Sequence, residues 1–219
     1  MVITNALGSI TSSNAILTVV PPITAAQGLV GWWRGESNVV DEFTGSIGYE
    51  TNGAGYASGK VGTGFSFDGT NSWVVIPTSP TLNFGSNQNF SVEAWIQTQP
   101  FAQPSYPNYG SYVQRASIVE KSSNPTDMSH TVGWKFFIDN TVLVFMMSQS
   151  SASNDFPGYW ATTNAVITDS NFHHVAATVD RTSKTGGKLY VDGQVVLTFD
   201  PTPQNGDLSN TSPLSIGTK

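Results

Sequence analysis

The feature that most limits the fold of this chain is the lack of a long helical pattern. No run longer than about ten residues repeats its apolar side chains every three to four positions, as an amphipathic helix requires. Short apolar or alternating stretches are instead separated by glycine, asparagine and proline. The clearest is residues 90–98, FSVEAWIQT, where alternation is typical of a strand with one buried face. The sequence therefore predicts an all-β chain.

One hairpin carries a strong turn signal. Asp192 and Gly193 lie between the β-forming stretches LYV and QVVL, and Asp-Gly suits a two-residue hairpin turn because glycine tolerates positive φ. Further strands are expected at residues 2–4, 15–20, 29–33, 64–69, 72–77, 115–121, 133–139, 141–148, 173–180 and 213–217. Because the strands are short and the loops are long, this pattern favours an antiparallel β-sandwich or jelly roll over a closed barrel.

Two segments show no strand period. Residues 35–62 form a long loop rich in glycine and asparagine, and residues 99–112 form an insertion rich in proline and tyrosine. A loop of this length without its own secondary structure is often functional. Trp33 and Trp95, by contrast, lie inside strand patterns, and we expect both in the core.

Charge and composition exclude several classes of function. The net charge is −6 and the sequence pI is about 4.8, which disfavours nucleic acid and anionic membrane surfaces as partners. The chain has no cysteine, so disulfides, zinc thiolate sites and thiol catalysis are excluded. No stretch approaches the roughly 20 apolar residues of a membrane span, so membrane insertion is not expected. Residues 1–10 lack the pattern of a signal peptide, and a signal for export would lie outside this chain.

The adjacent histidines His173 and His174 suggest an active site, but strand geometry argues against it. Successive side chains of a strand point to opposite faces, so the two imidazoles cannot enter one site. His173 shares its face with Val175 and Ala177, the more apolar side. The pattern therefore predicts framework residues rather than catalysts or metal ligands.

Four blocks of the sequence resemble a known family. They are GLVGWWRGE, GKVGTGFSFDGTNSWVVIP, FSVEAWIQ and FHHVAATVD followed by KLYVDGQVV. In this order they closely resemble the laminin G-like, concanavalin A-like jelly-roll domains of bacterial surface and secreted proteins, over roughly residues 28–217. The resemblance implies a concanavalin A-like antiparallel β-sandwich, a framework role for the paired histidines, and an extracellular or cell-surface location.

A second resemblance suggests the domain layout. Residues 2–20 are similar to the last two strands of a bacterial immunoglobulin-like domain, so we assign residues 1–22 to such a remnant with its linker and residues 23–219 to the jelly roll. Domains of the laminin G-like family usually continue with one more strand after SIG at 215–217, and this chain stops at Lys219. We expect the edge left unpaired to recruit another chain or residues 1–20, which predicts a strand-exchange dimer.

The resemblance also implies calcium as a structural cofactor near the rim of the sandwich. Calcium requires six to eight oxygen ligands, which flexible loops rich in glycine and asparagine can supply. The candidate ligands are Asp41, Thr44, Gly45 and Asp68. The alternative is that Asp41 caps its loop and that Asp68, before Gly69, is a turn residue whose side chain binds its own backbone.

Exposed aromatic residues are the candidates for sugar binding. Sugars present apolar C–H faces, so lectin sites pair an aromatic platform with hydrogen-bonding partners. The candidates are Asp155, Tyr159 and Trp160 in the segment NDFPGYW, with Tyr106 and Tyr109 in the proline-rich insertion. The alternative is that these rings pack the insertion against the sandwich.

We therefore expect a non-catalytic binding module, with a polysaccharide or glycan as its main partner and a cell-surface protein as a further one. A structural, adhesive or protein-binding module without a glycan site is the alternative, since a fold does not fix a function. A jelly-roll glycosidase or polysaccharide lyase is the third interpretation. A glycosidase requires two carboxylates converging on one sugar bond, whereas Glu93 and Glu120 stand alone in their strands.

Overall fold

The computed structural model describes residues 2–11, 26–98, 115–123, 131–149 and 157–217. The predicted strand at 15–20 and the insertion at 99–112 lie outside these residues. The strands are β1 (Val2–Asn5), β2 (Gly8–Thr11), β3 (Tyr49–Thr51), β4 (Gly55–Ser58), β5 (Thr63–Ser66), β6 (Trp73–Ile76), β7 (Phe90–Gln97), β8 (Arg115–Ser122), β9 (Gly133–Asp139), β10 (Val142–Ser148), β11 (Gly158–Ala161), β12 (Phe172–Val179), β13 (Gly187–Val191), β14 (Gln194–Phe199) and β15 (Leu214–Ile216). Two short 3-10 helices, Pro80–Leu82 and Thr202–Gln204, interrupt the connections.

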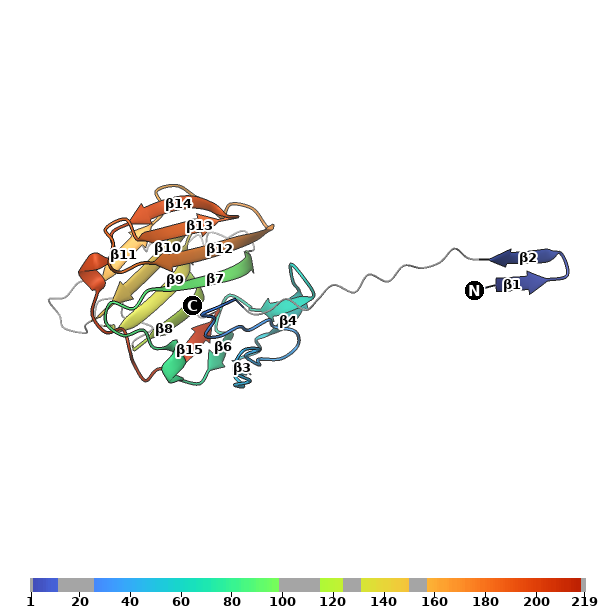
Figure 1. Ribbon diagram of the computed structural model, residues 1–219, viewed down its shortest axis with the longest axis horizontal. Coiled ribbons are helices and arrows are strands. Elements are labelled where there is room, and N and C mark those ends of the chain that lie inside the picture. Colours follow the sequence, from blue (N-terminus) through green and yellow to red (C-terminus); the bar gives the residue numbers. More distant parts are fainter. Residues whose placement is uncertain (1, 12–25, 99–114, 124–130, 150–156, 218–219) are drawn as a thin grey trace, which may run out of the picture.

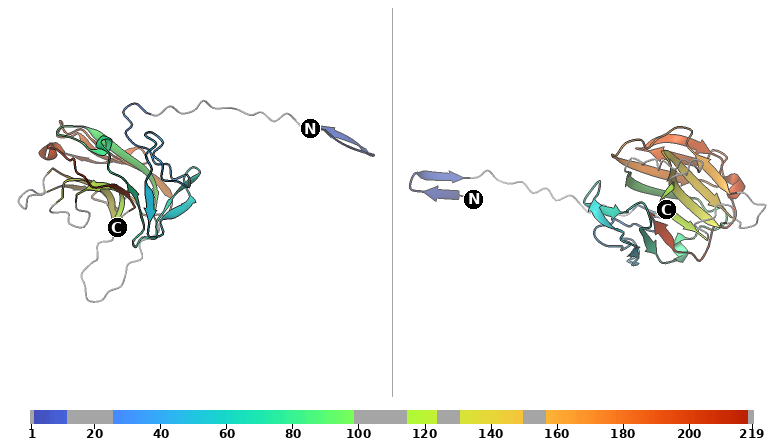
Figure 2. Two further views of the ribbon diagram at one scale, coloured as in Figure 1. Left: turned by 90° about the horizontal axis from the view of Figure 1, so that it is seen from below. Right: turned by 180° about the vertical axis from the view of Figure 1, so that it is seen from behind.

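Two antiparallel sheets lie face to face. The larger sheet has the order β11-β10-β9-β8-β15-β6-β3, and the smaller has the order β14-β13-β12-β7. In Figure 1 the smaller sheet lies in front of β8, β9 and β10, and the rear view in Figure 2 reverses them. The hairpins β1–β2 and β4–β5 form two further pairs. The predicted all-β antiparallel sandwich is confirmed.

The core fills the space between the two sheets, and alternation along each strand selects its members. On β12, Val175, Ala177 and Val179 face inward and are at most 2% exposed. On β10 the inward residues Leu143 and Phe145 are fully buried. These apolar faces supply the main free energy of folding, roughly 25 cal/mol for each Å² removed from water.

Three predictions about local structure are wrong. Residues 29–33 form no strand and contribute only a single bridge, between Trp33 and Asp41. The long loop at 35–62 contains β3 and β4, whose three or four residues are too short to show a period. Trp95 is 50% exposed rather than part of the core, because Ala94 and its alternate neighbours on β7 face inward. Trp33 does pack against the core.

The N-terminal hairpin agrees with the strand predicted at 2–4. Val2 pairs with Thr11 and Asn5 with Gly8. The assignment of residues 1–22 to an immunoglobulin-like remnant stays a prediction.

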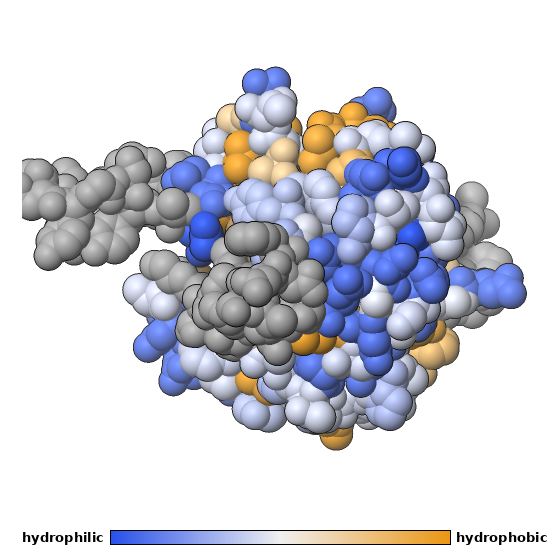
Figure 3. Space-filling view, turned by 90° about the vertical axis from the view of Figure 1, so that its left-hand side faces the viewer, coloured by the Kyte–Doolittle hydropathy of each residue, from blue (hydrophilic) through white to orange (hydrophobic). Residues whose placement is uncertain are grey.

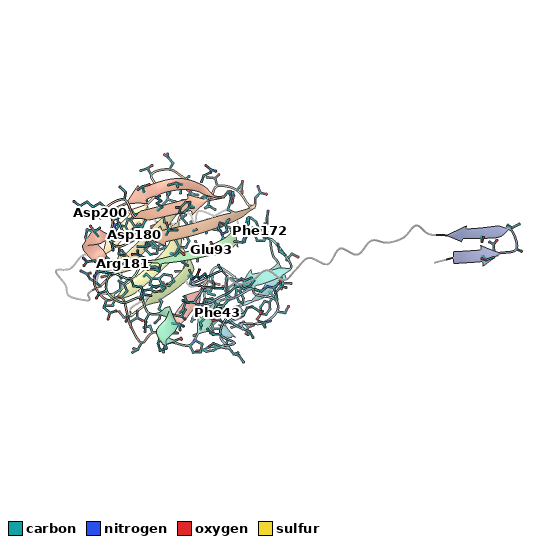
Figure 4. All side chains as sticks on the ribbon, viewed as in Figure 1. Phe43, Glu93, Phe172, Asp180, Arg181 and Asp200 are labelled. Atoms are coloured by element: carbon teal, nitrogen blue, oxygen red, sulfur yellow. The ribbon has the colours of Figure 1, made fainter. Side chains whose placement is uncertain are left out.

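The end of the sandwich at the left of Figure 1 has a largely polar surface. Figure 3 views this end and shows mainly hydrophilic residues, with apolar side chains gathered near the top, where Figure 1 places β14. Val195 on β14 is 51% exposed. The labelled residues at this end are Asp180, Arg181 and Asp200 (Figure 4).

Two buried cations hold the segment 200–213, which leads from β14 to β15. The guanidinium of Arg181 donates to the backbone carbonyls of Gly85, Gln204 and Gly206, with distances of 2.8 Å to Gly85 and 2.6 Å to Gln204. The ammonium of Lys121 donates to the carbonyls of Asn210 at 3.0 Å and Ser212 at 2.9 Å. Both side chains are about 1% exposed, and burial lowers the pKa of each. The pair fixes the path that brings β15 into the larger sheet.

Replacing Arg181 should therefore destabilise the domain strongly. In Arg181→Met the apolar stem remains, but buried carbonyls lose their donors, and we expect a loss of about 3 kcal/mol in the free energy of unfolding. Urea denaturation measures this loss. The matched control is Lys184→Met, since Lys184 is exposed and should change stability by less than about 0.5 kcal/mol. Equal effects of the two substitutions would contradict the role given to Arg181.

Candidate functional site

The face of the larger sheet that points away from the smaller sheet carries the most promising group of side chains. Its residues follow from strand register, because partners directly opposite each other share a face. At its centre Phe137, Val144 and Met146 form a second apolar cluster and are at most 3% exposed. Beside it the buried pair Lys135 and Glu120 lies 3.9 Å apart, from Nζ to Oε2.

One end of this face is open and combines an aromatic ring with charged groups. Tyr159 on β11 is 44% exposed, and its ring meets the ring of Phe137 edge to face at 6.2 Å. The Tyr159 hydroxyl lies 3.4 Å from Oδ2 of Asp139, and Nε of Arg115 donates to the same oxygen at 3.3 Å. The amide of Asn140 donates to the other oxygen of Asp139 at 3.1 Å. We call Arg115, Phe137, Asp139 and Tyr159 the Tyr159 site.

The electrostatics of the Tyr159 site keep the phenol protonated. Partial burial raises the pKa of Tyr159, and the negative charge of Asp139 raises it further. Arg115 acts in the opposite direction to a smaller extent. The site thus offers a ring face, a hydroxyl donor, a carboxylate acceptor and a guanidinium with its side chain 45% exposed.

Of the five residues predicted to bind sugar, the structure describes two and separates them. Tyr159 faces outward on β11, whereas Trp160, the next residue, faces inward. The Trp160 ring stacks on Phe199 at 4.4 Å and on Phe145 at 6.4 Å, and it packs against the core. The placement of Trp160 in a sugar platform is therefore wrong, because residues 158–161 form a strand that the sequence did not indicate.

The remaining sugar candidates stay predictions. Tyr106, Tyr109 and Asp155 lie outside the described residues. Sequence reasoning missed Arg115 and Asp139, which oppose each other on β8 and β9. The alternation of Lys135, Phe137 and Asp139 along β9 indicates that these three side chains share one face, and this was the signal that could have placed Asp139 there.

The two carboxylates of this face are too far apart for a glycosidase pair. Glu120 opposes Lys135 on β9, and Asp139 lies four residues further along that strand. At 3.2–3.4 Å per residue the two positions are about 13 Å apart. Glycosidase carboxylates lie roughly 5–9.5 Å apart. Each carboxylate also has a cationic partner, Lys135 or Arg115.

Three of the predicted calcium ligands meet in one turn. The carboxylate of Asp41 is 2% exposed and accepts hydrogen bonds from the backbone of Trp32 at 2.8 Å and Phe43 at 3.0 Å. Its second oxygen accepts from the Thr44 hydroxyl at 2.6 Å, and the Gly45 amide donates to the Asp41 carbonyl at 2.7 Å. Asp41 thus caps its loop, as the alternative interpretation holds.

Asp68 heads a different turn, between β5 and β6. Its Oδ1 accepts from the backbone of Thr70, Asn71 and Ser72 and from the Ser72 hydroxyl, at 2.7–3.2 Å. Hydrogen bonds, first from Thr70 and then from Ser72, hold the pKa of Asp68 well below its usual range. The carboxylate is ionised and serves the turn.

As they stand, the four predicted residues do not form one calcium site. At the Asp41 turn calcium would have to replace protein donors, because both carboxylate oxygens of Asp41 accept hydrogen bonds, whereas the donors to Asp68 all bind its Oδ1. Within the ranges that the structure describes, no three His, Cys, Asp or Glu side chains are grouped to hold a metal ion. Calcium as a structural cofactor stays a prediction.

A melt in EDTA and in millimolar calcium tests this prediction. If calcium binds at Asp68, saturating calcium should stabilise the wild type by about 2.7 kcal/mol at 100 times the Kd, and Asp68→Ala should lose that increment. The matched control is Asp200→Ala, which removes a turn aspartate bonded to Thr202 at the other end of the sandwich. A wild-type melting temperature that is unchanged by calcium would contradict the prediction.

The two histidines lie on opposite faces of β12, as strand geometry predicted. His173 Nδ1 lies 2.7 Å from Asp192 Oδ2, and its Nε2 lies 3.0 Å from Asp169 Oδ1. The ring therefore links the β13–β14 turn to the loop before β12. Hydrogen bonds to Asp192 and then to Asp169 raise the pKa of His173 above 6.5. This arrangement agrees with a framework role for His173.

His173 should make stability depend on pH. Folding favours the protonated ring, so its contribution is complete below pH 6.5, the unfolded value, and is lost as the pH rises through the raised folded pKa. We expect the urea midpoint of the wild type to fall from pH 5.5 to pH 8.5 by more than that of His173→Asn. An identical pH dependence in both proteins would show that the His173 charge contributes nothing.

The outer face of the smaller sheet carries a second group of side chains, centred on Trp95, which the sequence pattern predicts in the core. His174 meets the Trp95 ring edge to face at 5.3 Å, and its Nε2 lies 3.7 Å from Glu93. The ammonium of Lys60, at the tip of the β4–β5 hairpin, lies 5.0 Å from the Trp95 ring centre. This cation–π contact connects the hairpin to β7 and occupies the exposed indole.

Comparison with protein families agrees with the fold. A family model described as the concanavalin A-like lectin/glucanases superfamily matches residues 68–219. The chain belongs to this superfamily. Its antiparallel β-sandwich is thus that of a concanavalin A-like lectin/glucanase-type domain. No curated protein matches the sequence.

Similar solved structures are binding domains of botulinum neurotoxins. The binding domain of neurotoxin DC in complex with SialylT has a TM-score of 0.61 and 12% identity, covering 88% of this chain and 44% of that chain. The same domain with rat synaptotagmin II has a TM-score of 0.59 and 13% identity, covering 87% of this chain and 43% of that chain. A structure of neurotoxin type C, whose cell entry depends on two ganglioside molecules, has a TM-score of 0.60 and 14% identity, with coverages of 87% and 42%.

These similarities show a shared fold. This concanavalin A-like chain spans less than half the length of the neurotoxin chains that it matches. Among its described segments, no helix is long and apolar enough to cross a membrane.

Proposed function

We propose that this protein is a non-catalytic carbohydrate-binding module of a secreted or cell-surface protein, and that the sugar binds at the Tyr159 site. The observation that supports this proposal most directly is the half-exposed ring of Tyr159 beside the ion pair of Asp139 and Arg115. A sugar ring can stack its C–H face on the phenol while its hydroxyls donate to the carboxylate and accept from the guanidinium.

The position of the Tyr159 site supports this proposal. Its groups come from β8, β9 and β11 of one sheet, and sites built on strands are held more precisely than sites on loops. Phe137 supports both the Tyr159 ring and the guanidinium of Arg115, whose carbon lies 6.0 Å from the Phe137 ring centre. Little reordering is then required when a ligand binds, which favours affinity.

The alternative is a protein-binding or adhesive module without a glycan site. The binding domain of neurotoxin DC was solved both with synaptotagmin II and with SialylT, so both kinds of partner occur on this fold. The open aromatic ring beside a hydrogen-bonding pair favours sugar. The wide separation of Glu120 from Asp139 favours binding over glycoside hydrolysis.

Two adjacent residues of β11 provide the test. Affinity gel electrophoresis against neutral and acidic polysaccharides should show retardation of the wild type, and Tyr159→Ala should lose it with little change in melting temperature. Trp160→Ala should cost about 3 kcal/mol of stability, because it removes a ring from the core. Retained binding by Tyr159→Ala would exclude the Tyr159 site. Failure of every polysaccharide to retard the wild type would favour the protein-binding alternative.

A further inference from the structure

Strand β7 is the edge of the smaller sheet, and its outward backbone can be identified from the register. The amide of Asp192 donates to the carbonyl of His174 at 2.8 Å, so His174 directs its backbone groups toward β13. Along an antiparallel strand, successive residues direct their backbone groups to opposite sides. Val175, the next residue, therefore directs its N–H and C=O groups toward β7, where its partner is Ala94. The residues between these bonded positions direct their N–H and C=O groups away from β12. They are Ser91, Glu93, Trp95 and Gln97, which we call the β7 edge.

The side chains along this edge show that the interior is incompletely covered there. The inward residues of β7, Phe90, Val92, Ala94 and Ile96, are all only partly buried. On the neighbouring strand β12, the inward residues are at most 2% exposed. Phe65, Phe67 and Ile216 pack against the same core and are also only partly buried. Partly exposed apolar side chains thus lie along a strand whose outward backbone groups bond to no other residue that the structure describes.

The β7 edge has little of the usual protection of an edge strand. Natural edges are short, bulged, interrupted by proline, charged, or covered by a helix or loop. Near β7 the β4–β5 hairpin contacts the outer face through Lys60 and Trp95. β7 has eight residues, pairs with β12 without a register shift, and contains no proline. Its one charged residue is Glu93, whose side chain is 73% exposed on the outer face (Figure 4).

We propose that the β7 edge accepts one extended strand from a partner polypeptide. Backbone hydrogen bonds to Ser91, Glu93, Trp95 and Gln97 would add this strand to the smaller sheet, as in β-augmentation. Its alternate side chains are apolar, because they cover the partly buried core residues. The side chains that face the outer side near Glu93 are basic, because Glu93 is exposed and the protein has a net charge of −6, whereas Lys60 already lies against Trp95 at the next outward position.

A second copy of this chain is the poorer occupant. Its β7 has a suitable alternation, but pairing would bring together two Glu93 side chains and two molecules of net charge −6. The strand-exchange dimer predicted from the sequence stays a prediction, and at the β7 edge a partner of opposite charge is the better match. Strand addition at β7 is independent of sugar binding, since the Tyr159 site lies on the other sheet.

The test uses the whole 219-residue chain and two synthetic ten-residue peptides. One peptide alternates valine and lysine, and the other has the same composition arranged in two blocks. Fluorescence anisotropy should show the alternating peptide binding at least about tenfold more tightly, a difference of about 1.4 kcal/mol. Hydrogen exchange should slow at the amides of Ser91, Glu93 and Trp95 when it binds, and remain unchanged at Val92 and Ala94.

A matched pair of variants separates the contribution of the backbone N–H of residue 93 from that of the Glu93 charge. Both Glu93→Pro and Glu93→Gln remove the charge, but only proline removes the outward N–H, and proline is tolerated on edge strands where that N–H faces solvent. Glu93→Pro should bind the alternating peptide about tenfold more weakly than Glu93→Gln. If a thermal melt shows that Glu93→Pro does not fold, Ser91→Pro and Ser91→Ala form the second pair.

Three outcomes would overturn the proposal. Equal affinity for the two peptides would mean attraction by charge alone. Equal affinity of the proline variant and its control would mean that the outward N–H is not used. Dimerisation of the wild type that Glu93→Pro abolishes would make a second copy the occupant.

Discussion

The sandwich depends on two buried cations that hold backbone carbonyls rather than carboxylates. Arg181 and Lys121 bind carbonyls of the segment 200–213 and thereby guide β15 into the gap between β6 and β8. Without β15 the larger sheet would divide into β3–β6 on one side and β8–β11 on the other. A cation bound to carbonyls keeps its charge solvated by dipoles, and the carbonyls in this buried region are hydrogen-bonded. The two cations thus attach one segment both to Arg181, which follows β12, and to Lys121 on β8, so that the segment connects the two sheets.

Much of this fold could be predicted because its long strands carry a clear inside and outside. The alternation along β7 and β12 indicated which residues face the core, and it also separated the functions of His173 and His174. Short strands were missed, since the three or four residues of β3, β4 and β11 are too few to show a period. Trp95 shows a different limit of prediction. An apolar side chain suggests burial, but the alternation along β7 places Ala94 inward and therefore Trp95 on the outer face.

The candidate site was only partly predictable for the same reasons. Tyr159 was chosen as an exposed ring, but its neighbour Trp160 was placed with it because β11 was read as a loop. Arg115 and Asp139 are 24 residues apart in sequence, and only the register of β8 against β9 brings them together. Asp41 and Asp68 illustrate a further ambiguity, because a loop aspartate that could bind a cation often satisfies its own turn instead.

The position of β15 also affects how the chain folds during synthesis. Leu214 pairs with Ile76, 138 residues earlier, so the ribosome needs roughly 7 to 28 seconds between making the two partners. During this interval Val74 and Ile76 on β6 have no strand partner on the side that β15 later occupies, and their apolar side chains are part of an incompletely folded nascent chain. Contacts so distant in sequence slow folding and expose strand edges. The larger sheet can therefore close only after β15 has been made, and the edge of β6 stays unpaired until then.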